Sequence, residues 1–196
     1  NGDGLGDTSY DIDLLNKDRY PLMLPWTPTG IHDIAVRSIA TSKTVVGQGY
    51  NVRINVNVTN QGSATETFDV MVYANTTVIH TFSSVTLSTR ASTTFTFTWD
   101  TATFTEATYT INATVPQVLG ETDITDNSFV GWIALTIEGD INGDGTVDIY
   151  DAILLSGSFN AVLGGPRWNV NADFNFDGTT DIYDVIFLAN NFGKKA

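Results

Sequence analysis

The feature that most constrains this chain is a stretch of twelve residues that occurs twice in its last third. Residues Asp140–Asp151 read DINGDGTVDIYD, and residues Asp173–Asp184 read DFNFDGTTDIYD. Each copy has side-chain oxygens at positions 1, 3, 5, 9 and 12 and a glycine at position 6, the pattern of a loop that wraps around calcium. Such an ion takes about six to eight oxygen ligands, and alternate residues of a tight loop point toward it. The repeat therefore predicts two calcium sites.

The predicted ligands are the five side chains at these positions together with the backbone carbonyl at position 7. In the first copy they are Asp140, Asn142, Asp144, Thr146 (carbonyl), Asp148 and Asp151. In the second copy they are Asp173, Asn175, Asp177, Thr179 (carbonyl), Asp181 and Asp184. Gly145 and Gly178, at position 6, permit the sharp turn that the loop needs.

Two details separate these loops from a complete helix-loop-helix calcium hand. Position 12 is Asp instead of the usual Glu, and residues 134–137, which precede the first loop, have the pattern of a strand. Each site is therefore expected to be a loop followed by one helix. This duplicated half-hand, with Ile-Tyr-Asp at each loop exit, resembles the dockerin family over residues 138–196. The resemblance implies calcium binding and docking onto a cohesin domain of another protein.

The helices expected after the loops carry apolar residues at helical spacing, which predicts that most of these residues form a shared core. They are Ile149, Ala152, Ile153, Leu155 and Phe159 in the first helix, and Ile182, Val185, Ile186, Leu188 and Phe192 in the second. Tyr150 and Tyr183 stand at loop position 11, where dockerins contact their partner, so both are candidates for partner contact. Because Ile-Tyr replaces the small hydroxyl pair of many dockerins, a partner other than a cohesin is an alternative.

The two loops account for much of the net charge of −13, because 9 of the 22 acidic residues lie between Glu138 and Asp184. This charge disfavours nucleic acid as a partner. The chain has no cysteine, which excludes disulfides, and no apolar run approaches the about 20 residues of a membrane span. His32 and His80 are isolated, and no nucleophile and base form a recognisable pair, so we do not expect an enzyme.

Residues 31–138 alternate apolar and polar side chains, as strands with one buried face do. The clearest strand covers residues 50–59, and others are expected at about 33–40, 67–74, 78–82, 94–99, 107–115 and 127–137. This spacing favours a mainly β fold, an immunoglobulin-like antiparallel β-sandwich, with Tyr109 as its tyrosine corner. The words VVGQGY (45–50), VTNQG (58–62) and GETDITDN (120–127) resemble the CARDB family, adhesion-type sandwiches of bacterial and archaeal surface proteins.

Three Asn-X-Thr sequons lie on polar positions of this sandwich, at Asn57, Asn75 and Asn112. They are possible N-glycosylation sites of a glycoprotein. The alternative is chance occurrence, because the segment is rich in threonine.

The last strand and the loop before it hold the remaining candidates. Alternation places Phe129 and Ile133 inward and Trp132 outward, where Trp132 is a possible contact for the connector, the C-terminal module or a partner. The preceding loop contains Asp123, Asp126 and Asn127. Turn formation by these side chains is favoured over a third metal site.

Residues 1–30 are expected to form an extended segment and connector. The segment Asn1–Asp7 reads NGDGLGD, like NGDGTVD in the first loop, which indicates a truncated calcium loop with Asp3, Asp7 and Asp11 as possible ligands. The alternative is a glycine-rich turn with solvated acids. The stretch through RYPLM at residues 19–23 resembles the end of NosD-like β-helix proteins of archaeal surfaces. A sequence that starts at Asn1 without a signal peptide or a methionine suggests the mature form of a secreted protein or a fragment of a longer one, and this resemblance favours the fragment.

Three parts are thus predicted: residues 1–30, the sandwich at 31–138, and a small α-helical, dockerin-like domain with two calcium loops at 139–196. They favour a non-catalytic extracellular module that mediates calcium-dependent protein–protein assembly at a cell surface, with a cohesin-like partner and two calcium ions, or three if the N-terminal loop binds one. The alternative is a subunit that assembles with copies of itself into an extracellular filament or surface lattice.

Overall fold

A computed structural model describes residues 10–11, 17–18 and 30–196. The chain divides into two compact units, Asn1–Gly30 and Ile31–Ala196. In the first unit, β1 (Tyr10–Asp11) and β2 (Lys17–Asp18) pair antiparallel. The predicted ligands Asp3 and Asp7, and residues 19–23, lie outside the described residues, and for Asp11 only its place in β1 is described.

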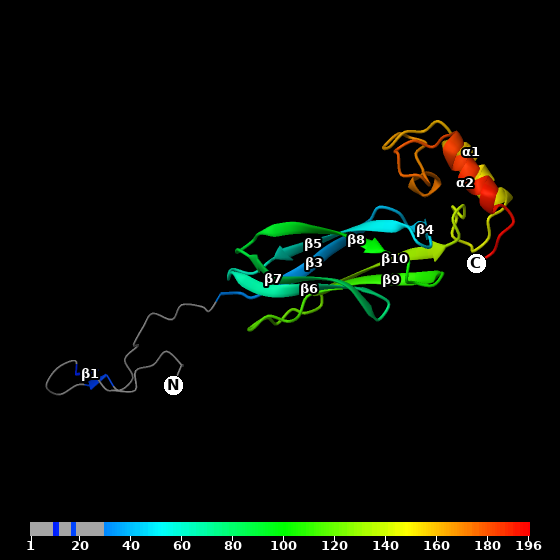
Figure 1. Ribbon diagram of the computed structural model, residues 1–196. Coiled ribbons are helices and arrows are strands. Elements are labelled where there is room, and N and C mark those ends of the chain that lie inside the picture. The colour runs from blue at the N-terminus through cyan, green and yellow to red at the C-terminus, as the bar shows by residue number, and fades with distance from the viewer. Residues whose placement is uncertain (1–9, 12–16, 19–29) are drawn as a thin grey trace. The chain divides into compact units, whose positions relative to one another are not determined.

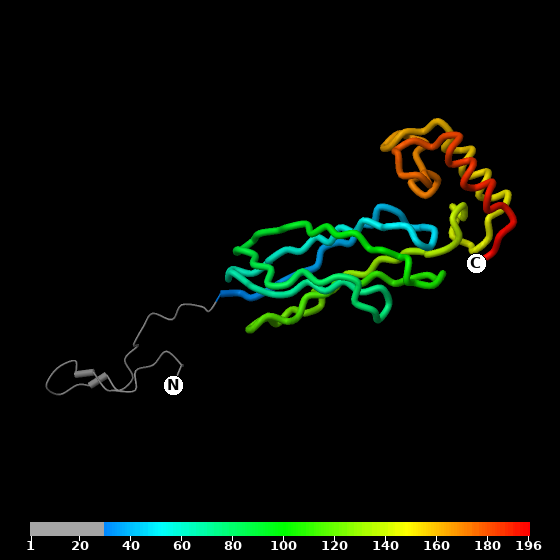
Figure 2. Tube along the Cα trace, in the orientation of Figure 1, coloured from blue at the N-terminus to red at the C-terminus, as the bar shows by residue number. Residues whose placement is uncertain are grey.

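The second unit begins with a sandwich of two sheets, traced in Figures 1 and 2. One sheet has the strand order β3 (Ile34–Thr41), β5 (Asn51–Asn60) and β8 (Ser92–Asp100). The other has the order β4-β10-β9-β6-β7. Its strands are β4 (Val45–Gly47), β6 (Glu66–Ala74), β7 (Thr77–Leu87), β9 (Ala107–Thr114) and β10 (Ser128–Thr136). Neighbouring strands pair antiparallel, whereas β4 pairs parallel with β10, and the predicted immunoglobulin-like architecture is confirmed.

The core of the sandwich lies between the two sheets because the inward positions of each strand are apolar. Along β5, the buried residues are Val52, Ile54, Val56 and Val58. Trp99, Phe104 and Tyr109 pack edge to face. The Tyr109 hydroxyl donates a hydrogen bond to the Thr105 carbonyl at 2.9 Å, so Tyr109 forms the tyrosine corner that the sequence predicts.

Two sequence expectations about the strands differ from the structure. The three-residue strand β4 was not predicted, because it is too short for alternation to reveal it. The inward placement of Phe129 is wrong, since Phe129 is exposed together with the other residues at the start of β10. Only the second half of β10, from Ile133, is covered on both faces, so alternation gives the wrong burial for the first half.

The C-terminal module contains α1 (Ile149–Ser158), the short 3-10 helix η1 (Val170–Ala172) and α2 (Ile182–Asn191). Its small core consists of Ile141, Val147, Leu155, Ala172, Phe174 and Leu188. Figure 1 shows α1 and α2 side by side, beyond the end of the sandwich that carries β4. The structure thus confirms a β-sandwich followed by a small helical module.

Candidate metal centre and its neighbouring surfaces

Each twelve-residue repeat folds as a loop that leads into one helix, as its sequence predicts. Asp148 and Asp181, at position 9, are the N-caps of α1 and α2, and each accepts a bond at 2.8 Å from an amide in the first helical turn. The position 12 residues Asp151 and Asp184 accept the cap backbone amides in return, also at 2.8 Å. This reciprocal capping box fixes where each helix starts.

The aspartates at positions 1 and 12 are the buried acids of the module. Asp140, Asp151, Asp173 and Asp184 are exposed by 3, 0, 4 and 0 %. A buried carboxylate is costly unless it receives hydrogen bonds or a cation. Asp151 accepts the amides of Ile141 and Asn142 at 2.8 and 3.2 Å, and Asp184 accepts that of Phe174 at 2.7 Å. These two carboxylates therefore hold the start of each loop against its end.

The two position 1 aspartates differ in how well they are satisfied. Asp140 accepts bonds from the Gly143 and Gly145 amides at 2.7 and 2.8 Å and from the Thr136 hydroxyl at 2.7 Å. Asp173 accepts a bond from the Gly178 amide at 3.1 Å, but its buried Oδ1 has no donor among the described residues. Burial raises the pKa of Asp173 above its ordinary value, against the Gly178 bond and the nearby Lys43, which lower it.

The side chains at positions 3 and 5 lie on the exposed rim of each loop. Asn142 bonds with Asp144, and Asn175 with Asp177, at 2.8 to 3.0 Å. The hydroxyl and amide of Thr179 bond to Asp177 and hold the pKa of that carboxyl below its ordinary value. Within the described part of the chain, no three acidic or histidine side chains converge on one centre.

The donor set nevertheless fits calcium. Every side-chain donor at the predicted positions is an oxygen, the ligand type that this ion prefers. The unpartnered Oδ1 of Asp173 marks one point where a cation would satisfy a buried acid. Both loops bury their position 1 and position 12 aspartates to a similar extent.

The two helices present a duplicated apolar surface, which we call the docking face. Its residues are Ile149, Tyr150, Ile153, Ile182, Tyr183 and Ile186, all exposed. Tyr150 and Tyr183 are exposed by 64 and 61 %, so both candidates for partner contact are accessible. Beside it, Ala152, Leu155, Ser156, Phe159, Val185 and Leu188 line a groove of about 400 Å³.

The expectation that most of the helical apolar residues form a shared core is therefore wrong for the four isoleucines of the docking face and for Phe192, which is also exposed. Leu155 and Leu188 are buried, and Ala152, Phe159 and Val185 pack against them. Two helices of ten residues cover only one stripe of each other, so the remaining apolar positions face outward.

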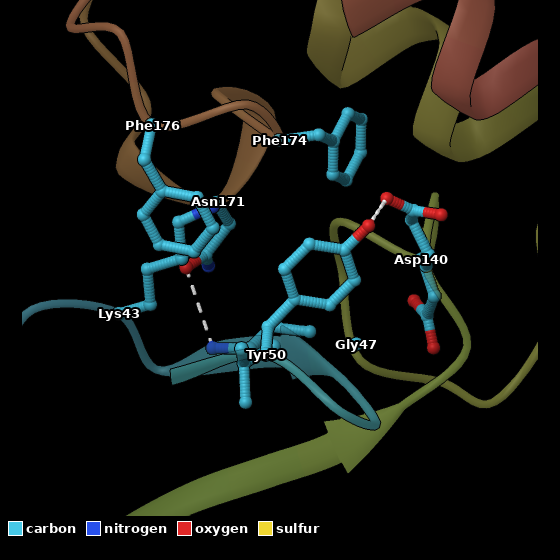
Figure 3. A pocket seen from close by; sticks show the side chains of 10 residues that line it. Lys43, Gly47, Tyr50, Asp140, Asn171, Phe174 and Phe176 are labelled. Carbon is cyan, nitrogen blue, oxygen red and sulfur yellow. Dashed lines mark hydrogen bonds between the residues drawn. The ribbon is translucent and has the colours of Figure 1, made fainter. Parts of the chain in front are cut away.

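A second group of contacts joins the second loop to the sandwich (Figure 3). Lys43, in the turn between β3 and β4, is buried, and its Nζ donates to the backbone carbonyl of Asp173. The same Nζ lies 3.9 Å from the centre of the Phe176 ring, within the range of a cation–π contact. Burial lowers the pKa of Lys43 to about 8, against the nearby acids Asp173, Asp184 and Glu138, which raise it.

Two further residues complete this joint. Asn171 Oδ1 accepts the amides of Thr44 and Val45, both at 3.3 Å, and its Nδ2 donates to the Thr44 hydroxyl at 3.2 Å. The Tyr50 hydroxyl donates to Glu138, and burial followed by this bond raises the pKa of Tyr50 to about 12. The Tyr50 ring stacks on Phe176 with the ring centres 6.1 Å apart.

The sequons differ in how free their amides are. Asn57 Nδ2 donates to the Thr93 carbonyl and the Thr94 hydroxyl, and the Oδ1 of Asn112 is buried. Asn75 lies exposed in the turn between β6 and β7, where its Oδ1 accepts the Thr110 amide at 2.9 Å. Asn75 is thus the most accessible of the three.

The remaining candidates lie on the sandwich. Trp132 is 57 % exposed, as expected. Asp123 accepts bonds from the amide and hydroxyl of Thr125 at 3.1 and 2.6 Å, which confirms its predicted role in a turn. Asn127 donates to Glu121 at 3.0 Å. The sequence did not single out Asp33, whose buried Oδ1 and that of Asp126 both lack a donor among the described residues.

Two family models match successive parts of the second unit. The CARDB family model matches residues 31–130, and the family model of the dockerin type I domain matches residues 138–193. Among curated proteins, none matches the chain. Among the helices that the structure describes, none is long and apolar enough to cross a membrane.

Solved structures resemble the sandwich. A crystal structure of a CARDB domain of Pyrococcus furiosus in complex with di-metal ions is 27 % identical, with a TM-score of 0.50 over 55 % of this chain and 96 % of that chain. A solution structure of that domain is 27 % identical, with a TM-score of 0.48 over 54 and 95 %. A β-glucosidase of Erythrobacter marinus is 14 % identical, with a TM-score of 0.43 over 53 % of this chain and 15 % of that chain.

Proposed function

Because the chain belongs to the CARDB family and continues into a dockerin type I domain, we propose that it is a non-catalytic extracellular module that joins its protein to a partner when calcium is bound. A dockerin type I domain implies calcium-dependent docking between proteins, and both families are non-catalytic. The observation that carries the proposal is the duplicated docking face, which directly follows the two acidic loops.

The ligands that we propose are those of the two repeats. The buried Asp140, Asp151, Asp173 and Asp184 already point into their loops, where they accept amides of their own loop. The rim side chains at positions 3 and 5 would turn inward when the ion supplies a stronger attraction than their mutual bonds. Loops of this kind can suit the high calcium concentrations found outside cells, where modules bind with Kd values of about 10⁻⁴ to 10⁻³ M.

Calcium titration of three variants by calorimetry tests the sites. We expect two loop ions in the wild-type chain and one loop ion for Asp151→Asn or Asp184→Asn, because each substitution removes a buried charge from one loop. The control is Asp69→Asn, an exposed acid of β6 that should leave both ions in place. Loop variants that bind as many ions as the wild type would contradict the ligand assignment.

The docking face tests the partner. A chain with Tyr150→Ala and Tyr183→Ala should lose binding to a recombinant cohesin domain, since an exposed aromatic side chain at the centre of an interface often contributes over about 2 kcal/mol. Thr67→Ala, on the exposed side of β6, is the control. If the wild type binds no cohesin but forms calcium-dependent polymers that the double variant cannot form, the partner is a second copy of this chain.

A second candidate function is cation binding by the sandwich itself. Buried oxygens of Asp33, Asp126 and Asn127 lack donors among the described residues. Burial, and then the charges of Asp126, Glu121 and Asp123, raise the pKa of Asp33, as expected where acids lie close together. The related Pyrococcus furiosus domain was solved with two metal ions.

The same calorimetry separates this candidate from the loop sites. With a sandwich site the wild type takes up three ions, and we propose that a chain with both loop substitutions keeps one of them and loses it when Asp33→Asn is added, because Asn cannot supply the charge. A double variant that binds no ion would contradict the sandwich site and leave the loop sites standing.

A further inference from the structure

The contacts between the sandwich and the second loop use groups that are not predicted calcium ligands. We call these contacts the latch: Lys43, Thr44 and Val45 on the sandwich side, and Asn171, Asp173 and Phe176 on the module side. The sandwich side is one short turn that leads into β4. The module side is the second loop and the residues just before it.

Each module-side group depends on the shape of the second loop. The Asp173 carbonyl belongs to position 1, and Phe176, at position 4, has a left-handed backbone with φ +62°. A side chain other than glycine or asparagine adopts this region only at an energetic cost, so the surrounding structure must hold it there. Asn171 lies two residues before position 1, in η1.

The sandwich side depends on the loop in turn. Lys43 is 4 % exposed, and a buried ammonium group is costly unless acceptors surround it. The Asp173 carbonyl and the Phe176 ring supply that environment. If the loop loses its shape, the Lys43 ammonium group is more stable in water. The turn between β3 and β4 then loses its contacts with the module.

The first loop is attached differently. It follows β10 directly, and the Thr136 hydroxyl of that strand donates to Asp140 at 2.7 Å. Chain continuity therefore keeps the first loop beside the sandwich, whereas the second loop, more than 30 residues further along, depends on the latch and on the module core.

We propose that calcium in the second loop closes the latch, so that the sandwich and the dockerin module form one rigid arm in calcium and move independently when this loop is empty. The inference rests on the proposed calcium sites. Binding equilibria are reciprocal, so a closed latch also strengthens calcium binding in the second loop. The turn between β3 and β4 is thus an interaction surface whose partner is the chain's own second loop.

The test compares rotational correlation times of the sandwich and the module, from amide ¹⁵N relaxation of the full chain. In calcium, the wild type should show one shared correlation time, whereas with EGTA the amides of the module should have shorter correlation times than those of the sandwich. Asp184→Asn should show two in calcium, whereas Asp151→Asn should keep one, because the latch is built on the second loop alone.

Lys43→Met then tests the latch without changing a predicted ligand. It should give two correlation times in calcium, while calorimetry still finds both loop ions and the step assigned to the first loop is unchanged. Arg167→Met, which removes one exposed positive charge from the module, should behave as wild type. Asn171→Ala is a second latch variant, for use if Lys43→Met disturbs the sandwich.

The outcomes separate the two proposals. A chain that binds two calcium ions but has the same correlation times with and without calcium overturns the latch and leaves the proposed function intact. A Lys43→Met variant and an Asn171→Ala variant that both stay rigid in calcium also overturn it. A chain that binds no calcium in its loops overturns both.

Discussion

Two tyrosine hydroxyls in the sandwich have different surroundings, and the difference is measurable. Tyr109 is buried and donates to the Thr105 carbonyl at 2.9 Å, whereas the Tyr73 hydroxyl contacts the Met71 sulfur at 3.4 Å. We expect Tyr109→Phe to lower the free energy of unfolding by about 1 kcal/mol, because it leaves a carbonyl without its donor. Tyr73→Phe, the matched control, should lower it by less. Urea unfolding gives both values, and equal losses would argue against the tyrosine corner as a stabilising contact.

At this scale the sequence predicts those residues whose role depends on spacing. The positions of the acidic residues follow from the loop pattern, which is local. Lys43 has no such signal, because its partner Asp173 lies 130 residues away and an isolated lysine in a turn usually faces solvent. The exposed isoleucines of the docking face were predicted as core for a related reason: helical spacing shows that a stripe is apolar, but not whether anything covers it.

The helices α1 and α2 are ten residues each, which is too short for stability in isolation. Four carboxylates brought about 5 Å apart, as around one ion, would repel one another by roughly 4 to 5 kcal/mol in water before salt screening if the ion were removed. A module of this size seldom has more than about 3 to 5 kcal/mol of core stability. We therefore expect EGTA to remove most of the helical circular dichroism, while the near-ultraviolet signal of buried Trp99 persists. Unchanged helical signal after chelation would show that the module folds without its ions.

Among the elements, the long strands were predicted because alternation is strong where one face is buried. The expected strand at residues 50–59 corresponds to β5 at Asn51–Asn60, and that at 67–74 to β6 at Glu66–Ala74. The strand β7 extends to Leu87, beyond the expected end at residue 82, because register shifts against β6 interrupt its alternation. The three-residue strand β4 is defined by its pairing with β10, which no local sequence pattern reveals.

For the whole molecule, the two domains should respond differently to calcium. An ion that binds the folded module stabilises it by about 2.7 kcal/mol at a free concentration of 100 times Kd. Scanning calorimetry should therefore show calcium raising the midpoint of the module's unfolding more than that of the sandwich. Asp184→Asn should reduce this increase. If calcium raises both midpoints equally, the domains unfold as one cooperative unit.

The order and type of the domains could be read from the sequence, since each carries its own pattern. Their joint could not, because it depends on a buried lysine, an asparagine and two aromatic rings that come from separate parts of the chain. Contacts between domains add no periodicity to either domain, and so leave no trace in a single sequence.

The two repeats differ at position 4 in how they contact the sandwich. Gly143 has φ +77°, and a β-carbon there would lie 3.1 Å from Val45 and 3.3 Å from Ala134. Its counterpart Phe176 also has a positive φ, +62°, but its ring contacts Lys43 and Tyr50. The two repeats therefore carry the same pattern of predicted metal ligands but contact the sandwich in different ways. A C-terminal module with its two repeats exchanged would keep every acidic residue but would lose these contacts with the sandwich.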